Sequence, residues 1–132
     1  MKSRLTILIV AAALVVVMAF AVASFGRAPQ QQQKQFALLM KATGPDFFKK
    51  TQEPEGKELV EKHFKKLQAL TQRGVILFSG HTLVTDESGF GIIIVRAESQ
   101  VEAQKIVDDD ELVKAGLIRG TVFPFEVVTS GK

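Results

Sequence analysis

The stretch VEKHFKKLQALTQRGVILFSGH, residues 60–81, contains a helix pattern, a glycine and a strand pattern in direct succession. Within residues 58–73 apolar side chains recur at intervals of three and four, which predicts one amphipathic helix. These apolar positions are Leu59, Val60, Phe64, Leu67 and Leu70. Pro54 can begin the helix and Gly74 can end it. The apolar residues 75–80 then predict a strand.

Two further strands are indicated on either side of this unit. Residues 35–43, QFALLMKAT, form a short apolar run that stops at Gly44, which fits a buried strand better than a helix. Residues 90–97, FGIIIVRA, predict another strand, and three consecutive isoleucines suggest that both of its faces are covered. The turn-rich residues 85–89 precede it, so this strand and the one at 75–80 can form a hairpin.

The last third of the chain predicts one more helix and one more strand. Ser99, followed three residues later by Glu102, is a capping box, and the helix that it begins is expected to end before Asp108. Residues 117–128, LIRGTVFPFEVV, are β-branched and aromatic and predict a strand. Pro124 lacks an N–H group for the sheet, so we expect this strand at an edge.

The resulting order is βαββαβ, which is typical of an α+β ferredoxin-like fold. In that fold two helices pack on one face of a four-stranded antiparallel sheet. The other face has no helix to cover it, and the sequence offers enough large apolar residues for us to expect that face to be apolar. The residues expected there are Phe36, Ile92, Ile94, Phe123 and Phe125. A second copy of the chain is the economical cover, so we expect a homodimer.

The chain begins with features of a secretory leader. Lys2 and Arg4 precede an uncharged apolar run of 18 residues, 5–22, and Ala21-Val22-Ala23 is a small-x-small cleavage site. We therefore expect residues 1–23 to be either a cleaved signal peptide or an uncleaved membrane anchor, since the run is also long enough to span a bilayer. In both cases the rest of the chain is exported, to the periplasm or beyond.

The exported part divides into a tether and one domain. Residues 24–34 are Gln-rich and lack apolar periodicity, so we expect a disordered tether before a domain at 35–130. Without Lys2 and Arg4 the remaining 15 basic residues exceed the 14 acidic residues by one, which argues against a nucleic-acid partner. The chain has no cysteine, which excludes disulfides and thiolate nucleophiles.

Four motifs follow one another along the domain. They are H-F-x-x-L-x-x-L-x-x-x-G from His63, L-F-S-G from Leu77, D-E-L-V-K-A-G-L from Asp110 and V-x-P-F from Val122. In this order and spacing the chain resembles the YCII-related family over nearly all of residues 35–128. The matching positions are His63, Leu67, Leu70, Gly80, Asp110, Ala115, Gly116, Pro124 and Phe125.

The resemblance implies a dimeric α+β barrel, in which two ferredoxin-like sheets face each other. It also implies a cleft in which the helix histidine, here His63, is a proposed active-site residue. Related barrel proteins include cofactor-free enzymes that act on small cyclic or aromatic compounds, among them muconolactone isomerases and dehydrochlorinases. The implied ligand is therefore a small organic molecule, and we expect no cofactor.

The chain also departs from the family's pattern at three places. His81 stands where many members have proline after the glycine of the second strand, and Asp110 is followed by glutamate instead of the usual proline. Members often carry a carboxylate near the end of the first strand, where this chain has Thr43, with Asp46 three residues later. The resemblance therefore leaves the carboxylate partner of His63 open.

His63 is the main candidate for chemistry. On a helical wheel it falls between Leu67 and Leu70, so its side chain is expected to face the sheet or a cleft. An imidazole there can serve as a general acid or base, because it titrates close to working pH. Alternatively, it is a core histidine satisfied by a backbone carbonyl and a hydroxyl such as that of Thr43 or Ser79.

The remaining polar candidates each have two readings. His81 ends a strand and is either a solvent-exposed loop residue or, with Thr43, a ligand-binding residue. Together with His63 and an aspartate such as Asp46, Asp86 or Asp110 it would form a facial metal triad, but the spacing fits no local metal motif, so we expect no metal. Asp110 is either a catalytic carboxylate or the cap of the turn that leads to Gly116.

Three hypotheses for the function follow. The first is a small-molecule-binding domain with general acid/base chemistry of the isomerase or lyase type at His63. The second is a non-catalytic binding or structural module of the cell envelope, in which His63 is a packed polar group. The third, a metal-dependent activity, requires His63 and His81 to converge.

Overall fold

The computed structural model describes residues 33–129, so the expected leader and most of the expected tether lie outside the described residues. β1 begins at the last residue of that tether. The elements are β1 (Lys34–Ala42), α2 (Phe47–Gln52), α3 (Pro54–Gln72), β2 (Ile76–His81), β3 (Gly91–Ala97), α4 (Gln100–Asp108), α5 (Glu111–Lys114) and β4 (Ile118–Phe125). None of these helices is long and apolar enough to cross a membrane.

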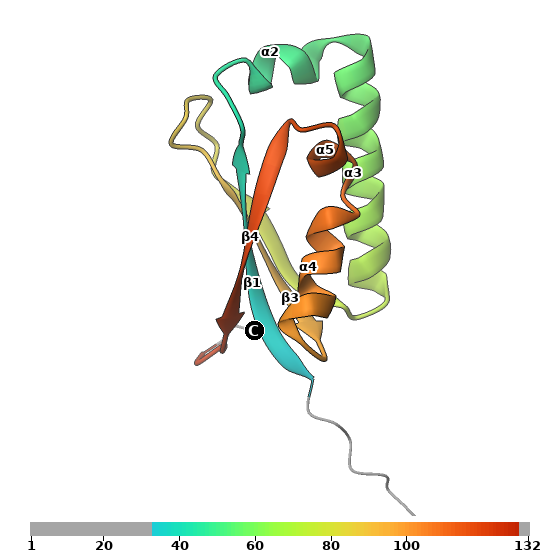
Figure 1. The fold of residues 1–132 in the computed structure, drawn as a ribbon, viewed down its shortest axis with the longest axis vertical. Helices are drawn as coiled ribbons and strands as arrows, with labels where there is room; N and C mark the ends of the chain where they lie inside the picture. The colour runs from blue at the N-terminus through green and yellow to red at the C-terminus, as the bar shows by residue number, and fades with distance from the viewer. Residues whose placement is uncertain (1–32, 130–132) are drawn as a thin grey trace, which may run out of the picture. The chain divides into compact units, whose positions relative to one another are not determined.

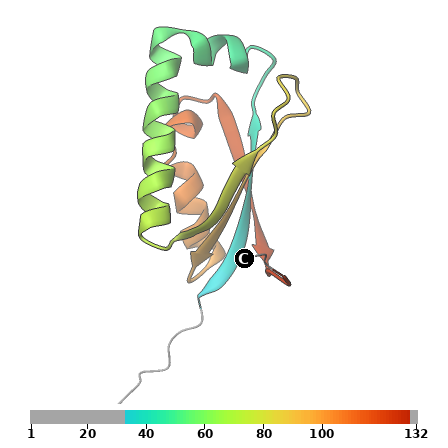
Figure 2. The same cartoon turned by 180° about the vertical axis from the view of Figure 1, so that it is seen from behind.

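The four strands form one antiparallel sheet in the order β2-β3-β1-β4. This confirms the α+β ferredoxin-like fold, the pairing of β2 with β3, and the edge position of the strand that contains Pro124. Helices α3, α4 and α5 lie on one side of the sheet (Figure 1). From behind, the other side of the sheet has no helix across it (Figure 2).

The ends of the two long helices follow local sequence signals. Pro54 stands in the first turn of α3, and Gly74 after its end has φ 72°, a backbone conformation that favours glycine. The Oγ of Ser99 accepts a hydrogen bond from the backbone N–H of Glu102 at 3.2 Å, as the capping box predicts for α4. Helices α2 and α5 were not predicted, because six and four residues are too few to show a helical period.

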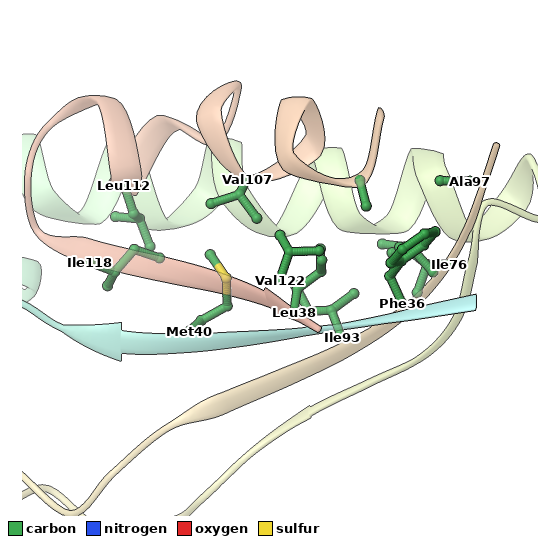
Figure 3. Close-up of a cluster of buried hydrophobic side chains, with 12 residues drawn as sticks. Phe36, Leu38, Met40, Ile76, Ile93, Ala97, Val107, Leu112, Ile118 and Val122 are labelled. Atoms are coloured by element: carbon green, nitrogen blue, oxygen red, sulfur yellow. The ribbon is translucent and has the colours of Figure 1, made fainter. Parts of the chain in front are cut away.

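The core lies between the sheet and the helices (Figure 3). Alternate residues of β1 point into it, together with residues of β2, β3, β4, α4 and α5. The buried cluster consists of Phe36, Leu38, Met40, Ile76, Ile93, Val95, Ala97, Ala103, Val107, Leu112, Ile118 and Val122. Phe36 is 3% exposed in this cluster. The prediction that placed Phe36 on the opposite face of the sheet was wrong. Successive residues of a strand point to opposite faces, and Phe36 belongs to the set that points into the core.

The face of the sheet that carries no helix is called the uncovered face below. The pairing register places on it Gln35, Ala37, Leu39, Lys41, Phe78, Gly80, Ile92, Ile94, Arg96, Arg119, Thr121, Phe123 and Phe125. Ala37 and Ile94 are buried but lie outside the core cluster, as expected for residues that point away from the helices. Phe78, Phe123 and Phe125 are 58%, 47% and 41% exposed. The uncovered face is therefore largely apolar and includes four of the five residues predicted for it.

Helix α4 packs closely on Gly120 of β4. A Cβ atom at this position would lie 2.5 Å from Cγ1 of Val107 and 2.8 Å from Sδ of Met40. Both neighbours belong to the buried cluster, so neither side chain has free space to move into. The absence of a side chain at Gly120 is thus a condition for packing α4 on the sheet.

We expect Gly120→Ala to lower the free energy of unfolding by about 1–3 kcal/mol, because the added methyl group overpacks this contact. Urea denaturation of both chains measures the difference. Gly44→Ala is the matched control, since a Cβ at Gly44 meets no atom within 4 Å. A Gly120→Ala chain as stable as the Gly44→Ala chain would contradict the packing argument.

Candidate active site

The structure brings His63 of α3 together with Asp110, which is 47 residues away in the sequence. Nδ1 of His63 lies 2.5 Å from Oδ2 of Asp110. The two side chains are 12% and 4% exposed, so the pair is largely shielded from water. Hydrogen bonds between charged groups are shorter and stronger than neutral ones, and shielding strengthens them further. This pair is called the dyad below.

Asp110 is also the N-cap of α5. Its backbone is extended, with φ −69° and ψ 135°, and its Oδ1 accepts hydrogen bonds from the backbone N–H groups of Leu112 at 2.9 Å and Val113 at 3.4 Å. One oxygen of the carboxylate therefore holds the start of α5, and the other holds His63. The capping geometry considered from the sequence is present, and the same residue supplies the carboxylate partner that the family resemblance had left open.

Lysines of α3 also interact with the segment around Asp110. Nζ of Lys66 donates a hydrogen bond to the backbone carbonyl of Asp109. Lys62 forms an i,i+4 ion pair with Glu58. This pair raises the pKa of Lys62, and the negative charge of Glu111 raises it by a smaller amount. The hydrogen bond of Lys66 therefore connects α3, close to His63, with the residue before the cap of α5.

The ionisation of Asp110 reflects three environmental effects. Burial is the largest and raises the pKa of Asp110, because it penalises the charged form. The hydrogen bond and the Coulomb interaction with His63 lower it, and the N–H groups of Leu112 and Val113 lower it further. The lowering effects together outweigh burial, so the pKa of Asp110 lies below its ordinary value and the dyad holds a carboxylate.

The second ring nitrogen of His63, Nε2, is not part of the hydrogen bond to Asp110. If Nδ1 donates its hydrogen to Asp110, Nε2 of the neutral imidazole carries a lone pair. No hydrogen bond within residues 33–129 engages Nε2, and no buried side-chain nitrogen or oxygen in that range lacks a partner. Nε2 therefore reaches the surface. The ring of Phe64 makes an edge contact with the imidazole of His63, at 5.2 Å between centroids, and is 51% exposed.

The other residues singled out from the sequence lie elsewhere. Oγ1 of Thr43 donates to the backbone carbonyls of Gly116 at 2.6 Å and Leu117 at 3.1 Å, which ties the end of β1 to the turn before β4. His81 is exposed at the end of β2, with Nδ1 3.0 Å from the carbonyl of Thr82. Neither is a hydrogen-bond partner of the dyad. Within the part of the chain that the structure describes, no three His, Asp or Glu residues gather as metal ligands.

Comparison with known protein families identifies the family of this chain. The model of the YCII-related domain matches residues 35–126, which include both members of the dyad. The chain belongs to the YCII-related family. No protein of curated function matches its sequence. The YCII-related assignment made from the four sequence motifs is thereby confirmed.

A solved structure supports the same fold. It is 5-chloro-2-hydroxyhydroquinone dehydrochlorinase of Burkholderia phenoliruptrix AC1100, in complex with 2,5-dihydroxybenzoquinone. The alignment has a TM-score of 0.54 and 23% identity, and covers 70% of this YCII-related chain and 93% of the dehydrochlorinase. At this identity the likeness establishes the shared fold and leaves the chemistry of this chain to its own residues.

Two features of the site were not recognised in the sequence. Phe64 was counted among the apolar positions of α3, yet it is half exposed and is absent from the residues packed against the core cluster. Its position at the edge of the apolar arc, beside a histidine, was the available signal. The pairing of His63 with Asp110 was not assigned either, because nothing local in the sequence connects residues 47 positions apart.

We expect Asp110→Asn to be less stable than the parent chain near neutral pH by about 2 kcal/mol, because it weakens a hydrogen bond between charged groups. The pKa of Asp110 is lower in the folded chain. Its contribution is therefore complete above the unfolded-state value of about 3.9 and is lost as pH falls through the folded-state value. Urea denaturation from about pH 5 to about pH 2 should show the difference shrinking.

Asp108→Asn is the control, because it removes the same charge at an exposed position close by. Its free energy of unfolding should follow that of the parent chain through the same pH range. A stability difference between the parent chain and Asp110→Asn that stays constant into acid would contradict a depressed carboxylate pKa in the dyad.

Proposed function

We propose that this YCII-related protein binds a small cyclic or aromatic organic molecule and transfers a proton on it through Nε2 of His63. The observation that carries the proposal is the dyad: a shielded histidine whose Nδ1 is held by a carboxylate, while Nε2 has no hydrogen-bond partner among residues 33–129. A carboxylate so placed selects the ring tautomer and stabilises the imidazolium that forms when Nε2 accepts a proton. If the pairing of His63 with Asp110 had only a structural role, Nε2 of His63 would not need to be accessible.

The proposed step is general acid/base catalysis without a cofactor. Nε2 of His63 accepts a proton from a C–H or O–H bond of the ligand, whose bonding electrons remain on the ligand. The proton then returns to another atom of the ligand, as in an isomerase, or to a departing group, as in a lyase. Asp110 stays ionised throughout. Such a positioned base accelerates a reaction by about 10²–10⁴-fold.

The comparisons support the ligand class. The neighbouring dehydrochlorinase, which shares the fold, was solved with a six-membered cyclic dihydroxyquinone. Acidic hydroxyl groups on such a ring are suitable proton donors to an imidazole. The half-exposed ring of Phe64 beside His63 adds an apolar surface on which a planar ring can stack.

We expect 2,5-dihydroxybenzoquinone or a small lactone to shift the imidazole proton signals of His63 in NMR spectra, because a ligand on Nε2 changes the environment of that ring. The signals of His81 should stay in place. His63→Gln and His81→Gln variants assign the two sets of signals. His63→Gln should also weaken binding at least about tenfold, since the ligand loses a direct hydrogen-bond partner.

His81→Gln is the matched control, because it removes a histidine that is exposed and outside the dyad. If no cyclic compound moves the His63 signals and His63 does not titrate before the chain unfolds, the non-catalytic alternative holds. In that case the protein is a binding or structural module in which the dyad only fastens α3 to α5.

We also propose that two copies pair through the uncovered face. Its three exposed phenylalanines, Phe78, Phe123 and Phe125, form an apolar surface that a monomer would leave in water. An identical face on a second chain buries this surface with closed two-fold symmetry. The molar mass of a single chain in solution, at all concentrations, would contradict this pairing.

The location of the protein is a further part of the proposal. The leader pattern in residues 1–23 supports export and tethering of the domain outside the cytoplasm. We expect a chain expressed with its own leader to be recovered from the cell envelope. Mass spectrometry of its N-terminus distinguishes the alternatives: Ser24 as the first residue indicates cleavage, and the retained leader indicates an anchor. Recovery of the uncleaved chain from the cytoplasm alone would contradict export.

A further inference from the structure

The ionisable residues of the uncovered face all have the same sign. They are Lys41 of β1, Arg96 of β3 and Arg119 of β4, and no aspartate or glutamate lies among the described residues of that face. None of the ion pairs between described residues includes any of the three. This contrasts with α3, where Lys62 and Lys65 each pair with a glutamate one turn away.

Two of these cations are direct neighbours. The register of β1 with β4 sets Lys41 opposite Arg119, so their side chains project side by side from the same face. Like charges directly opposite each other destabilise a pair of antiparallel strands. Lys41 is partly buried, so water screens it incompletely. An anion bound between the two side chains would offset this repulsion.

An apolar floor adjoins the cationic pair. Two residues further along each strand the register places Leu39 opposite Thr121 on one side and opposite Ile92 on the other, and the next pair on β1 and β4 is Ala37 and Phe123. Two residues of a strand span about 6.6–6.8 Å, so the ring of a small acid whose carboxylate lies at the cationic pair extends toward Leu39. The uncovered face thus has two cations at one end and apolar side chains one strand repeat away from them.

We propose that Lys41 and Arg119 bind the carboxylate of a small aromatic or alicyclic acid, whose ring lies on Leu39 and Ile92. The inference rests on the proposed pairing of two copies through the uncovered face. Two facing sheets bring together six cations and no carboxylate from either face, so self-association lacks a charge partner that an organic anion supplies. The apolar floor favours an acid with a ring over an inorganic anion.

This site is separate from the dyad, because His63 lies on α3, on the helix side of the sheet. The bound acid would promote dimer formation. An acid that binds only the dimer stabilises it by mass action. With two sites per dimer, a concentration of about ten times the dissociation constant of the acid strengthens pairing by about a hundredfold, or less if the monomer also binds.

The test is sedimentation equilibrium of residues 24–132 with benzoate, at constant ionic strength. For the parent chain we expect the dissociation constant of the dimer to fall at least about tenfold as benzoate is added. The Lys41→Gln/Arg119→Gln double variant should pair at least as well without benzoate, because the repulsion is gone, and should not respond to it. Lys57→Gln/Arg73→Gln, which removes two exposed cations of the α3 region, is the matched control and should respond like the parent chain.

Three results would overturn the proposal. A chain that remains monomeric at every benzoate concentration removes the proposed pairing on which it rests. A Lys41→Gln/Arg119→Gln chain that still responds to benzoate places the anion elsewhere. An equal response to acetate or chloride shows an unspecific salt effect without recognition of a ring. His63→Gln should respond to benzoate as the parent chain does, so failure here and failure of the proposed proton transfer are distinguishable.

Discussion

A carboxylate that is almost completely shielded from water needs hydrogen bonds on both oxygens, and Asp110 satisfies this constraint by joining separate parts of the chain. Oδ1 holds the first turn of α5, and Oδ2 holds His63 at the middle of α3. The helix layer depends on this junction, because α5 is only four residues long and has no helical stability of its own. The same junction fixes the histidine ring, and within the part of the chain that the structure describes no group bonds to Nε2. Structural support and candidate chemistry thus share one side chain.

The sheet separates two surfaces of different character. On the helix side, alternate residues of the strands form a close-packed core in which even one methyl group at Gly120 has no room. On the uncovered face the intervening residues present phenylalanines and three cations without a carboxylate. The dyad belongs to the first side, and the proposed pairing and acid-binding site belong to the second. The proposed proton transfer thus belongs to one copy of the chain, and the proposed acid binding to the surface between two copies.

Most of the fold was predictable because its signals are local. The period of α3, the capping box of α4, the turn before β3 and the proline of β4 each act within a few residues. Phe36 was assigned to the wrong face, since a strand of continuous apolar residues gives no alternation from which to choose a parity. Helices α2 and α5 were missed because both are too short to show a period. Helix α5 in addition depends on its contacts with α3, which is distant in the sequence.

The sequence by itself determined the βαββαβ order, the family and the two residues that form the dyad as separate candidates, because helix periods, caps and motifs are written in neighbouring residues. Only the tertiary structure decided that His63 and Asp110 meet, that Phe64 is exposed beside them, and that Lys41 faces Arg119. These relations depend on how α3 packs against α5 and on the strand register between β1 and β4. Packing and register are set by the whole core at once, so no segment of the sequence contains them.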